Sequence, residues 1–121
     1  MFVLESLDPA TPFPVQLQQD AGPIVLINTL RVPEGTVDQA IQTWQDDATL
    51  MRAQPGFVSA VLHRGIGTSR LLVNVSVWES TAALQKAFSS PAFQEKAKNY
   101  PEGTVVYPHV FQRAAVVDAA A

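Results

Sequence analysis

Hydrophobic residues recur with two different periods along this chain, and each period predicts one kind of secondary structure. Runs rich in β-branched and aromatic residues predict four strands. These runs cover residues 24–32, 57–64, 70–78 and 104–113. Between the first two runs, apolar residues recur three and four positions apart as far as Pro55, which predicts a helix. Ser80 or Thr81 can begin a second helix, and the pair Ser90-Pro91 is typical of the start of a third.

This order of elements predicts the fold class. Two strand-helix-strand units with right-handed crossovers can interleave into one four-stranded antiparallel sheet, with the helices on one face. The strands then lie in the spatial order four-one-three-two. We therefore predict an α+β protein with the ferredoxin-like β-α-β-β-α-β arrangement.

The third predicted strand indicates that both faces of this sheet are covered. Alternate residues of a strand point to opposite faces. One face of this strand carries Leu71, Val73, Val75 and Val77, and the other carries Leu72, Asn74, Ser76 and Trp78. If helices cover one face, the aliphatic residues of the other face need the sheet of a second copy. We predict a homodimer in which two sheets pack face to face, a dimeric α+β barrel.

The chain divides into three segments of different composition. Residues 1–23 carry four prolines, which predicts an extended N-terminal arm that either lies along a neighbouring surface or is disordered. Residues 24–113 contain all the predicted strands and helices and form the domain. Residues 114–121 are an Ala-rich tail without a pattern. Within the last strand, Pro108 cannot donate to a ladder and indicates an edge strand or a bulge.

Charge and composition exclude several classes of function. The 121 residues carry a formal net charge of −3 with scattered Lys and Arg, so we expect no nucleic-acid partner. The chain has no cysteine, which excludes thiolate catalysis and cysteine-based zinc sites. Its longest apolar run is far shorter than the roughly 20 residues of a membrane span, and the N-terminus has no secretory pattern. We expect a protein of the cytoplasm with no membrane partner.

Motifs for common chemistries are also missing from the sequence. It shows no nucleophile elbow, no phosphate-binding glycine loop, no dinucleotide fingerprint and no metal-ligand spacing, so we expect no metal. Asp46 and Asp47 are adjacent on the first predicted helix, and we interpret them as part of a solvated face.

Two asparagines inside predicted strands are the strongest candidates for a site. Asn28 lies in the first strand and Asn74 in the third, which are neighbours in the predicted sheet. Asparagine is depleted in strands, and a buried amide without partners costs about 1–3 kcal/mol. Either amide alone could equally satisfy a neighbouring backbone or hydroxyl group. Both together, with Trp78 on the face of Asn74, predict an apolar cavity under the helices.

The hydrophobic pattern gives less information about the remaining candidates. His63 near the end of the second strand is a candidate base, although a strand-end histidine is often simply solvated. Its face cannot be assigned, because a hairpin loop of about five residues leaves the register open by one. Tyr107 and His109 share a face of the last strand and are reserve candidates. Leu84, Phe88 and Phe93 on the later helices would shape a binding pocket.

Several segments in order resemble one protein family. The segments INTLRVPEG, RAQPGFVSAVLHR, LLVNVSVWES and AFSSPAFQ are similar to the antibiotic biosynthesis monooxygenase family of dimeric ferredoxin-like proteins, over roughly residues 24–113. Within that family, cofactor-independent anthrone oxygenases of aromatic polyketide pathways carry an Asn on the first strand and an Asn-x-x-x-Trp on the third. Asn28 and the run from Asn74 to Trp78 match that pattern.

The resemblance implies a monooxygenase that acts on an electron-rich aromatic substrate with dioxygen and needs no cofactor. The substrate loses a proton, its anion reduces dioxygen by one electron, and the radical pair recombines. Asn28, Asn74 and the indole N–H of Trp78 would then stabilise the developing oxyanion, with His63 as a candidate base.

Two other functions stay open for this fold. A non-catalytic dimer that binds a small ligand or is associated with stress would use the same cavity without turnover. Haem binding or degradation is disfavoured, because similar haem proteins place a histidine in the second helical region, whereas residues 81–100 contain none.

Overall fold

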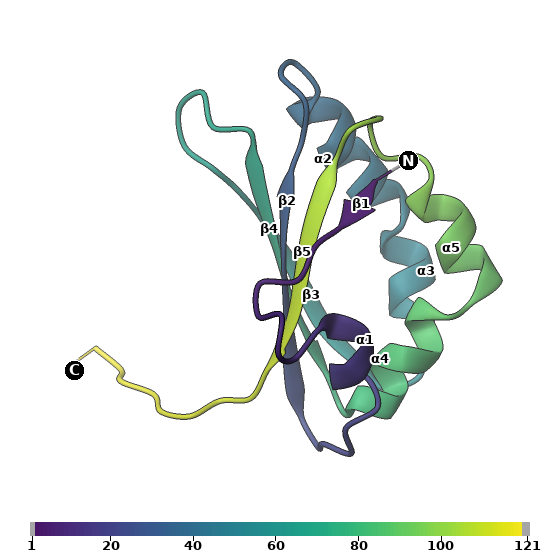
Figure 1. Cartoon of the computed structure of the whole chain (residues 1–121), viewed down its shortest axis with the longest axis vertical. Helices are drawn as coiled ribbons and strands as arrows, with labels where there is room; N and C mark the ends of the chain where they lie inside the picture. The colour runs from purple at the N-terminus through teal and green to yellow at the C-terminus, as the bar shows by residue number, and fades with distance from the viewer. Residues whose placement is uncertain (1, 120–121) are drawn as a thin grey trace.

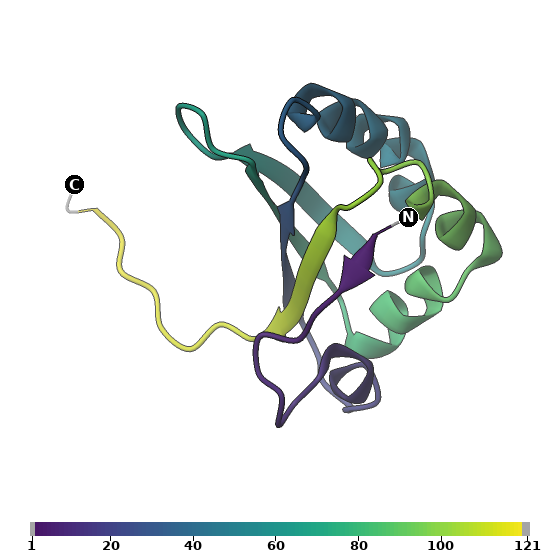
Figure 2. The same ribbon diagram turned by 45° about the horizontal axis from the view of Figure 1, so that its top comes forward.

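A five-stranded sheet forms one layer of the molecule and the helices lie across one of its faces (Figures 1 and 2). The computed structural model describes residues 2–119. The strands are β1 (Val3–Leu4), β2 (Ile24–Arg31), β3 (Phe57–Arg64), β4 (Leu71–Trp78) and β5 (Val105–Phe111). The helices are α1 (Phe13–Gln16), α2 (Val37–Asp46), α3 (Ala48–Arg52), α4 (Thr81–Phe88) and α5 (Pro91–Ala97).

The strand order is β1-β5-β2-β4-β3, so the four predicted strands have the predicted arrangement. β2 pairs antiparallel with β4 and β5, and β3 pairs antiparallel with β4. The α+β class and the ferredoxin-like fold are thereby confirmed. The additional strand β1 comes from the proline-rich arm and pairs parallel with β5.

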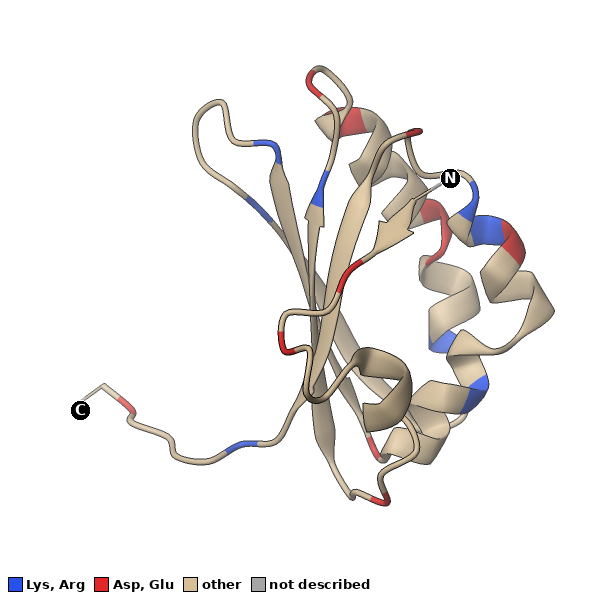
Figure 3. Cartoon of the chain, in the orientation of Figure 1, with Lys and Arg blue, Asp and Glu red and all other residues tan. Residues whose placement is uncertain are grey.

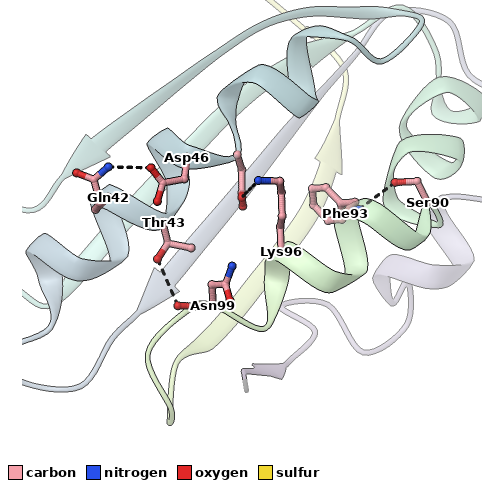
Figure 4. Close-up of polar contacts among 8 residues, drawn as sticks. Gln42, Thr43, Asp46, Ser90, Phe93, Lys96 and Asn99 are labelled. Atoms are coloured by element: carbon pink, nitrogen blue, oxygen red, sulfur yellow. Dashed lines mark hydrogen bonds and ion pairs between the residues drawn. The ribbon is translucent and has the colours of Figure 1, made fainter.

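The later helices begin where the sequence predicts. The hydroxyl oxygen of Ser80 accepts a hydrogen bond from the N–H of Ala83 (3.1 Å) at the start of α4. Ser90 accepts from the N–H of Phe93 (3.2 Å) at the start of α5, where Pro91 occupies the first turn (Figure 4). Each serine therefore pairs an N–H group that the helix itself leaves without a partner.

The first predicted helix is instead divided into α2 and α3, with a break at Asp47. The Asp47 N–H is shared between the carbonyl groups of Thr43 and Trp44, so the hydrogen-bond ladder changes register there. Asp46 stays exposed and accepts a hydrogen bond from the Gln42 amide (2.8 Å; Figure 4). Asp47 is buried, so the prediction of a solvated face is wrong for this residue. The Asp47 side chain is therefore covered by protein instead of facing solvent.

The two faces of the sheet have different environments. Leu26, Leu30, Leu72 and Trp78 are buried under the helices. The opposite face, which we call the open face, carries a row in which Ile27 lies beside Val75 and Val75 beside Val61. The Val61 side chain is 52% exposed. In Figure 3 the charged residues lie mainly in loops, helices and strand ends, and β4 and β5 contain none. The open face is therefore largely uncharged.

The N-terminal arm packs against its own sheet. Phe13 in α1 is only 2% exposed and belongs to the same apolar cluster as Leu26 and Trp78. Gln16 accepts a hydrogen bond from the Val110 N–H (2.9 Å) and donates one to the Val110 carbonyl (3.0 Å). The prolines did not prevent this helix, because Pro14 lies in its first turn, where no N–H partner is needed. Beyond β5, residues 112–119 have no regular structure and lead away from the sheet (Figure 1).

Pro108 lies at a point of β5 where the backbone polar groups are directed away from β2. The Val106 carbonyl accepts from Glu5, and the Val110 backbone pairs with Gln16, so even-numbered residues direct their polar groups away from β2. Pro108 lies between them, and its missing N–H costs no bond to β2. β1 pairs with only the first two residues of β5, so it does not pair with Pro108, whose side chain is nevertheless buried.

Candidate functional site

A cavity of about 460 Å³ lies between the helices and the sheet. Its sheet side includes Leu26, Asn28, Asn74 and Trp78. The other side is formed by residues of α2 to α5, and Phe2 of the arm contributes as well. A volume of this size is ordinary for a site that holds a small organic molecule.

Asn28 and Asn74 are direct neighbours on the sheet side of this cavity. They are register partners of β2 and β4 and point to the same face. Both side-chain oxygens, Asn28 Oδ1 and Asn74 Oδ1, are buried and have no hydrogen-bond partner among the described residues. An unpaired buried polar group costs about 1–3 kcal/mol. Two such groups side by side at a cavity indicate a place where a ligand supplies the missing partners.

Trp78 reaches the same cavity, but its indole nitrogen is already engaged. The Nε1–H donates to Ser76 Oγ at 3.0 Å, and the whole side chain is buried. The Phe57 ring packs edge-on against the indole, with 5.2 Å between ring centroids. Trp78 therefore presents its ring to the cavity and uses its donor within the protein.

The three residues expected to shape a pocket all line this cavity. Leu84 is 1% exposed. Phe88 packs against Phe93 with 4.9 Å between ring centroids, and against Phe13 of the arm with 5.1 Å. These contacts hold the rings as one aromatic wall.

His63 does not belong to this cavity. It is the register partner of Val73 in β4 and shares the open face with it, on the far side of the sheet from Asn74. The candidate base is therefore separated from the two amides of its own chain by the sheet. Tyr107 and His109 lie on the open face too, since their partners in β2 are Thr29 and Ile27.

Sequence reasoning missed four polar residues of the cavity wall, which are Asp47, Arg52, Ser59 and Tyr100. Two of them have shifted pKa values. Burial raises the pKa of the Asp47 carboxyl, while the positive charge of Lys96 partly opposes this. Burial, and then the Asp47 charge, raise the pKa of the Tyr100 hydroxyl. Asp47 follows Trp44 by three residues and precedes Met51 by four, and this helical spacing would have placed it on the buried stripe.

Two further features limit the kinds of site present. Among residues 2–119, no three His, Cys, Asp or Glu side chains gather in a way that would hold a metal ion. Within the same residues, none of the helices has the length and apolar character that crossing a membrane requires.

The sequence of residues 23–99 matches the sequence model of the antibiotic biosynthesis monooxygenase family. This match spans more than half of the chain. The chain belongs to this family. The family match includes β2, β3 and β4 with both asparagines, whereas the arm and β5 lie outside it. No curated protein matches the sequence.

Solved structures share the fold of this family member. SnoaB, a cofactor-independent oxygenase from Streptomyces nogalater, is 22% identical and superposes with a TM-score of 0.74 over 82% of this chain and all of SnoaB. A protein from Shewanella loihica PV-4 is 29% identical, with a TM-score of 0.66 over 81% of this chain and 99% of its own. PA3566 from Pseudomonas aeruginosa is 19% identical, with a TM-score of 0.63 over 78% of this chain and 97% of its own.

Proposed function

We propose that this protein is a cofactor-independent monooxygenase that oxidises an electron-rich hydroxylated aromatic compound with dioxygen. The observation that carries the proposal is the pair of facing amides, Asn28 and Asn74, with unpaired oxygens at an otherwise mainly apolar cavity. Family membership and the likeness to SnoaB support the class of reaction.

The polar groups of the cavity define the kind of ligand. An amide oxygen accepts a hydrogen bond from a phenolic hydroxyl, and an amide NH₂ donates to a carbonyl or phenolate oxygen. The aromatic wall of Phe88 and Phe93 suits a flat ring system. A polycyclic phenol that also carries a ketone, as in anthrones, provides both kinds of polar group on one flat molecule.

Such a substrate can react with dioxygen without a cofactor. Loss of a ring C–H proton gives a delocalised anion whose charge lies largely on an oxygen. The two amide NH₂ groups stabilise that charge. The anion then reduces dioxygen by one electron, and the two radicals combine. In the net reaction a CH₂ group becomes a carbonyl, and the second oxygen atom leaves as water.

Trp78 has a different part in this proposal from the one that the family pattern implies. Because its N–H donates to Ser76, we assign its ring to the wall that orients the substrate. The two asparagines alone then stabilise the oxyanion. We retain the homodimer as part of the proposal, because the aliphatic row on the open face needs cover.

Oxygen consumption with a panel of anthrones and hydroquinones tests the function. We expect uptake that depends on both the substrate and the protein, and a large loss in Asn28→Leu and Asn74→Leu. Asn99→Leu is the matched control, because it removes an exposed asparagine side chain. Uptake equal to that of buffer would overturn the proposal. If the same compounds also bound with micromolar affinity, a non-catalytic binding function would take its place.

A further inference from the structure

Three ionisable side chains line the cavity without a part in the function proposed above, and Asp47 is the acidic one among them, beside Arg52 and Tyr100. Asp47 lies at the break between α2 and α3 and lines the cavity with a side chain only 11% exposed. Asn28 and Asn74 lie on the sheet side of the same cavity, whereas Asp47 belongs to its helical side. A ligand between helices and sheet thus meets a carboxylate as well as the amide pair.

A structural role does not account for this carboxylate. Asp47 occupies the N-cap position of α3, where an aspartate commonly accepts a hydrogen bond from the helix, but its side chain accepts none. Its one polar contact among the described residues is a long ion pair, with 3.9 Å between its Oδ1 and the ammonium group of Lys96. The carboxylate is therefore oriented by one partner and keeps acceptor positions open to the cavity.

We infer that Asp47 is the general base that removes the C–H proton from the substrate, an assignment that rests on the proposed oxygenase function. Its carboxylate meets the requirements of a base at this cavity: it is buried, it lines the space proposed for the substrate, and apart from the long ion pair with Lys96 its acceptor positions are unused among the described residues.

In the proposed reaction, Asp47 accepts two protons in turn from the same substrate carbon. A substrate C–H bond breaks, an O–H bond forms on Asp47, and the electron pair stays in the ring with its charge on the oxygen held by the amides. The anion transfers one electron to dioxygen, and recombination forms a C–O bond to a peroxide anion. Asp47 returns its proton to the peroxide and removes the second C–H proton. The O–O bond then breaks, the carbonyl forms, and the hydroxide that leaves takes the proton from Asp47 to become water, which regenerates the carboxylate.

The charged neighbours of Asp47 set its basicity. Burial raises its pKa, Lys96 from α5 lowers it, and Asp46 raises it. A base with a pKa raised toward the working pH transfers protons more effectively. Tyr100, which follows α5, keeps its proton because burial and the Asp47 charge raise its pKa, so it cannot replace Asp47 as base. Arg52 of α3 also lines the cavity and is permanently cationic.

Exchange of the substrate C–H proton in the absence of oxygen tests this step apart from oxidation. Anthrone deuterated at its methylene carbon is incubated anaerobically with the protein, and loss of deuterium is followed by mass spectrometry. We expect the wild-type protein to accelerate exchange over buffer. Asp47→Asn should lose about 10²-fold or more of that acceleration while binding anthrone with similar affinity. The matched control Asp38→Asn, which changes an exposed carboxylate of α2 outside the cavity lining, should retain it.

The pH dependence of the exchange rate gives a second measurement. It would not change in the expected way if Asp47 had only a structural role. Lys96→Met removes the charge that lowers the Asp47 pKa, so the acid limb of the exchange rate should shift to higher pH. Lys98→Met, which removes a lysine paired with Glu95 on the surface, should leave the limb unchanged. Equal exchange by Asp47→Asn and wild type would overturn the assignment of Asp47. Exchange that needs Asp47, together with no oxygen uptake, would support the base and reject the oxygenase.

Discussion

Asn28 on β2 lies directly opposite Asn74 on β4, and the two amide oxygens are buried without partners among the described residues. The neighbouring pairs on the same face of these strands are Leu26 with Ser76 and Leu30 with Leu72, so the amides interrupt an otherwise mainly apolar surface. A sequence selected for stability alone would place apolar side chains here. The pair therefore marks a position where stability is lowered in favour of binding.

The first prediction follows from this cost. Asn74→Leu removes an unsatisfied amide and inserts an apolar side chain of similar size, so it should raise the free energy of unfolding by about 1 kcal/mol. The same change should abolish oxygen uptake. Urea unfolding and an oxygen electrode measure the two effects on one preparation. A variant that is clearly less stable than wild type would show that Asn74 has a structural partner.

The sequence was sufficient to place these two residues on adjacent strands. Alternation fixes the face of each residue within a strand, and the strand order makes β2 and β4 neighbours. Asn28 and Asn74 could therefore be assigned to adjacent strands before the register was known. Trp78 followed from Asn74, since four residues along a strand return to the same face. The role of its N–H did not follow, because a donor and a serine two residues apart gave no signal of the Ser76 contact.

Two positions were not predicted from the sequence, the face of His63 and the burial of Asp47. The face of His63 depended on the register of one hairpin, and β3 contains a register shift between Phe57 and Ser59. Asp47 is buried although its neighbour Asp46 is exposed, because its spacing of three residues from Trp44 and four from Met51 places it on the apolar side of the helix. The register shift of β3 leaves no mark in hydrophobic periodicity, whereas the spacing of Asp47 does.

The second prediction concerns the turn before β3. Gly56 has φ of +83°, and a Cβ atom there would lie 2.5 Å from the Ala83 Cβ on α4. Gly56→Ala should therefore lower the free energy of unfolding by about 3 kcal/mol, from backbone strain together with the clash. Gly67→Ala is the matched control: its φ is +64° but nothing lies within 4 Å, so strain alone should cost about 1 kcal/mol. Equal losses measured by chemical denaturation would show that α4 moves aside freely.

The third prediction concerns the attachment of the arm. Gln16 pairs with both backbone polar groups of Val110, and its amide nitrogen also lies 3.2 Å from His109 Nε2. Gln16→Leu should leave the edge of β5 unpaired there, so amide hydrogen exchange at Val110 should become much faster. Gln18→Leu changes an exposed glutamine two residues away and should leave that exchange unchanged. Continued protection of the Val110 amide in Gln16→Leu would mean that packing of Phe13 alone holds the arm.

The fourth prediction tests the open face. Val75 lies at the centre of the apolar row, between Ile27 on β2 and Val61 on β3. If a second sheet covers this row, Val75→Asp places a carboxylate in a dry interface, where an unpaired charge is strongly unfavourable. The wild-type protein should then sediment as a dimer at micromolar concentration and Val75→Asp as a folded monomer. Ile66→Asp introduces the same charge in a loop where the side chain is 94% exposed, and it should remain dimeric. A wild-type chain that sediments as a monomer would remove the dimer from the proposed function, because its open face would then be stable in water.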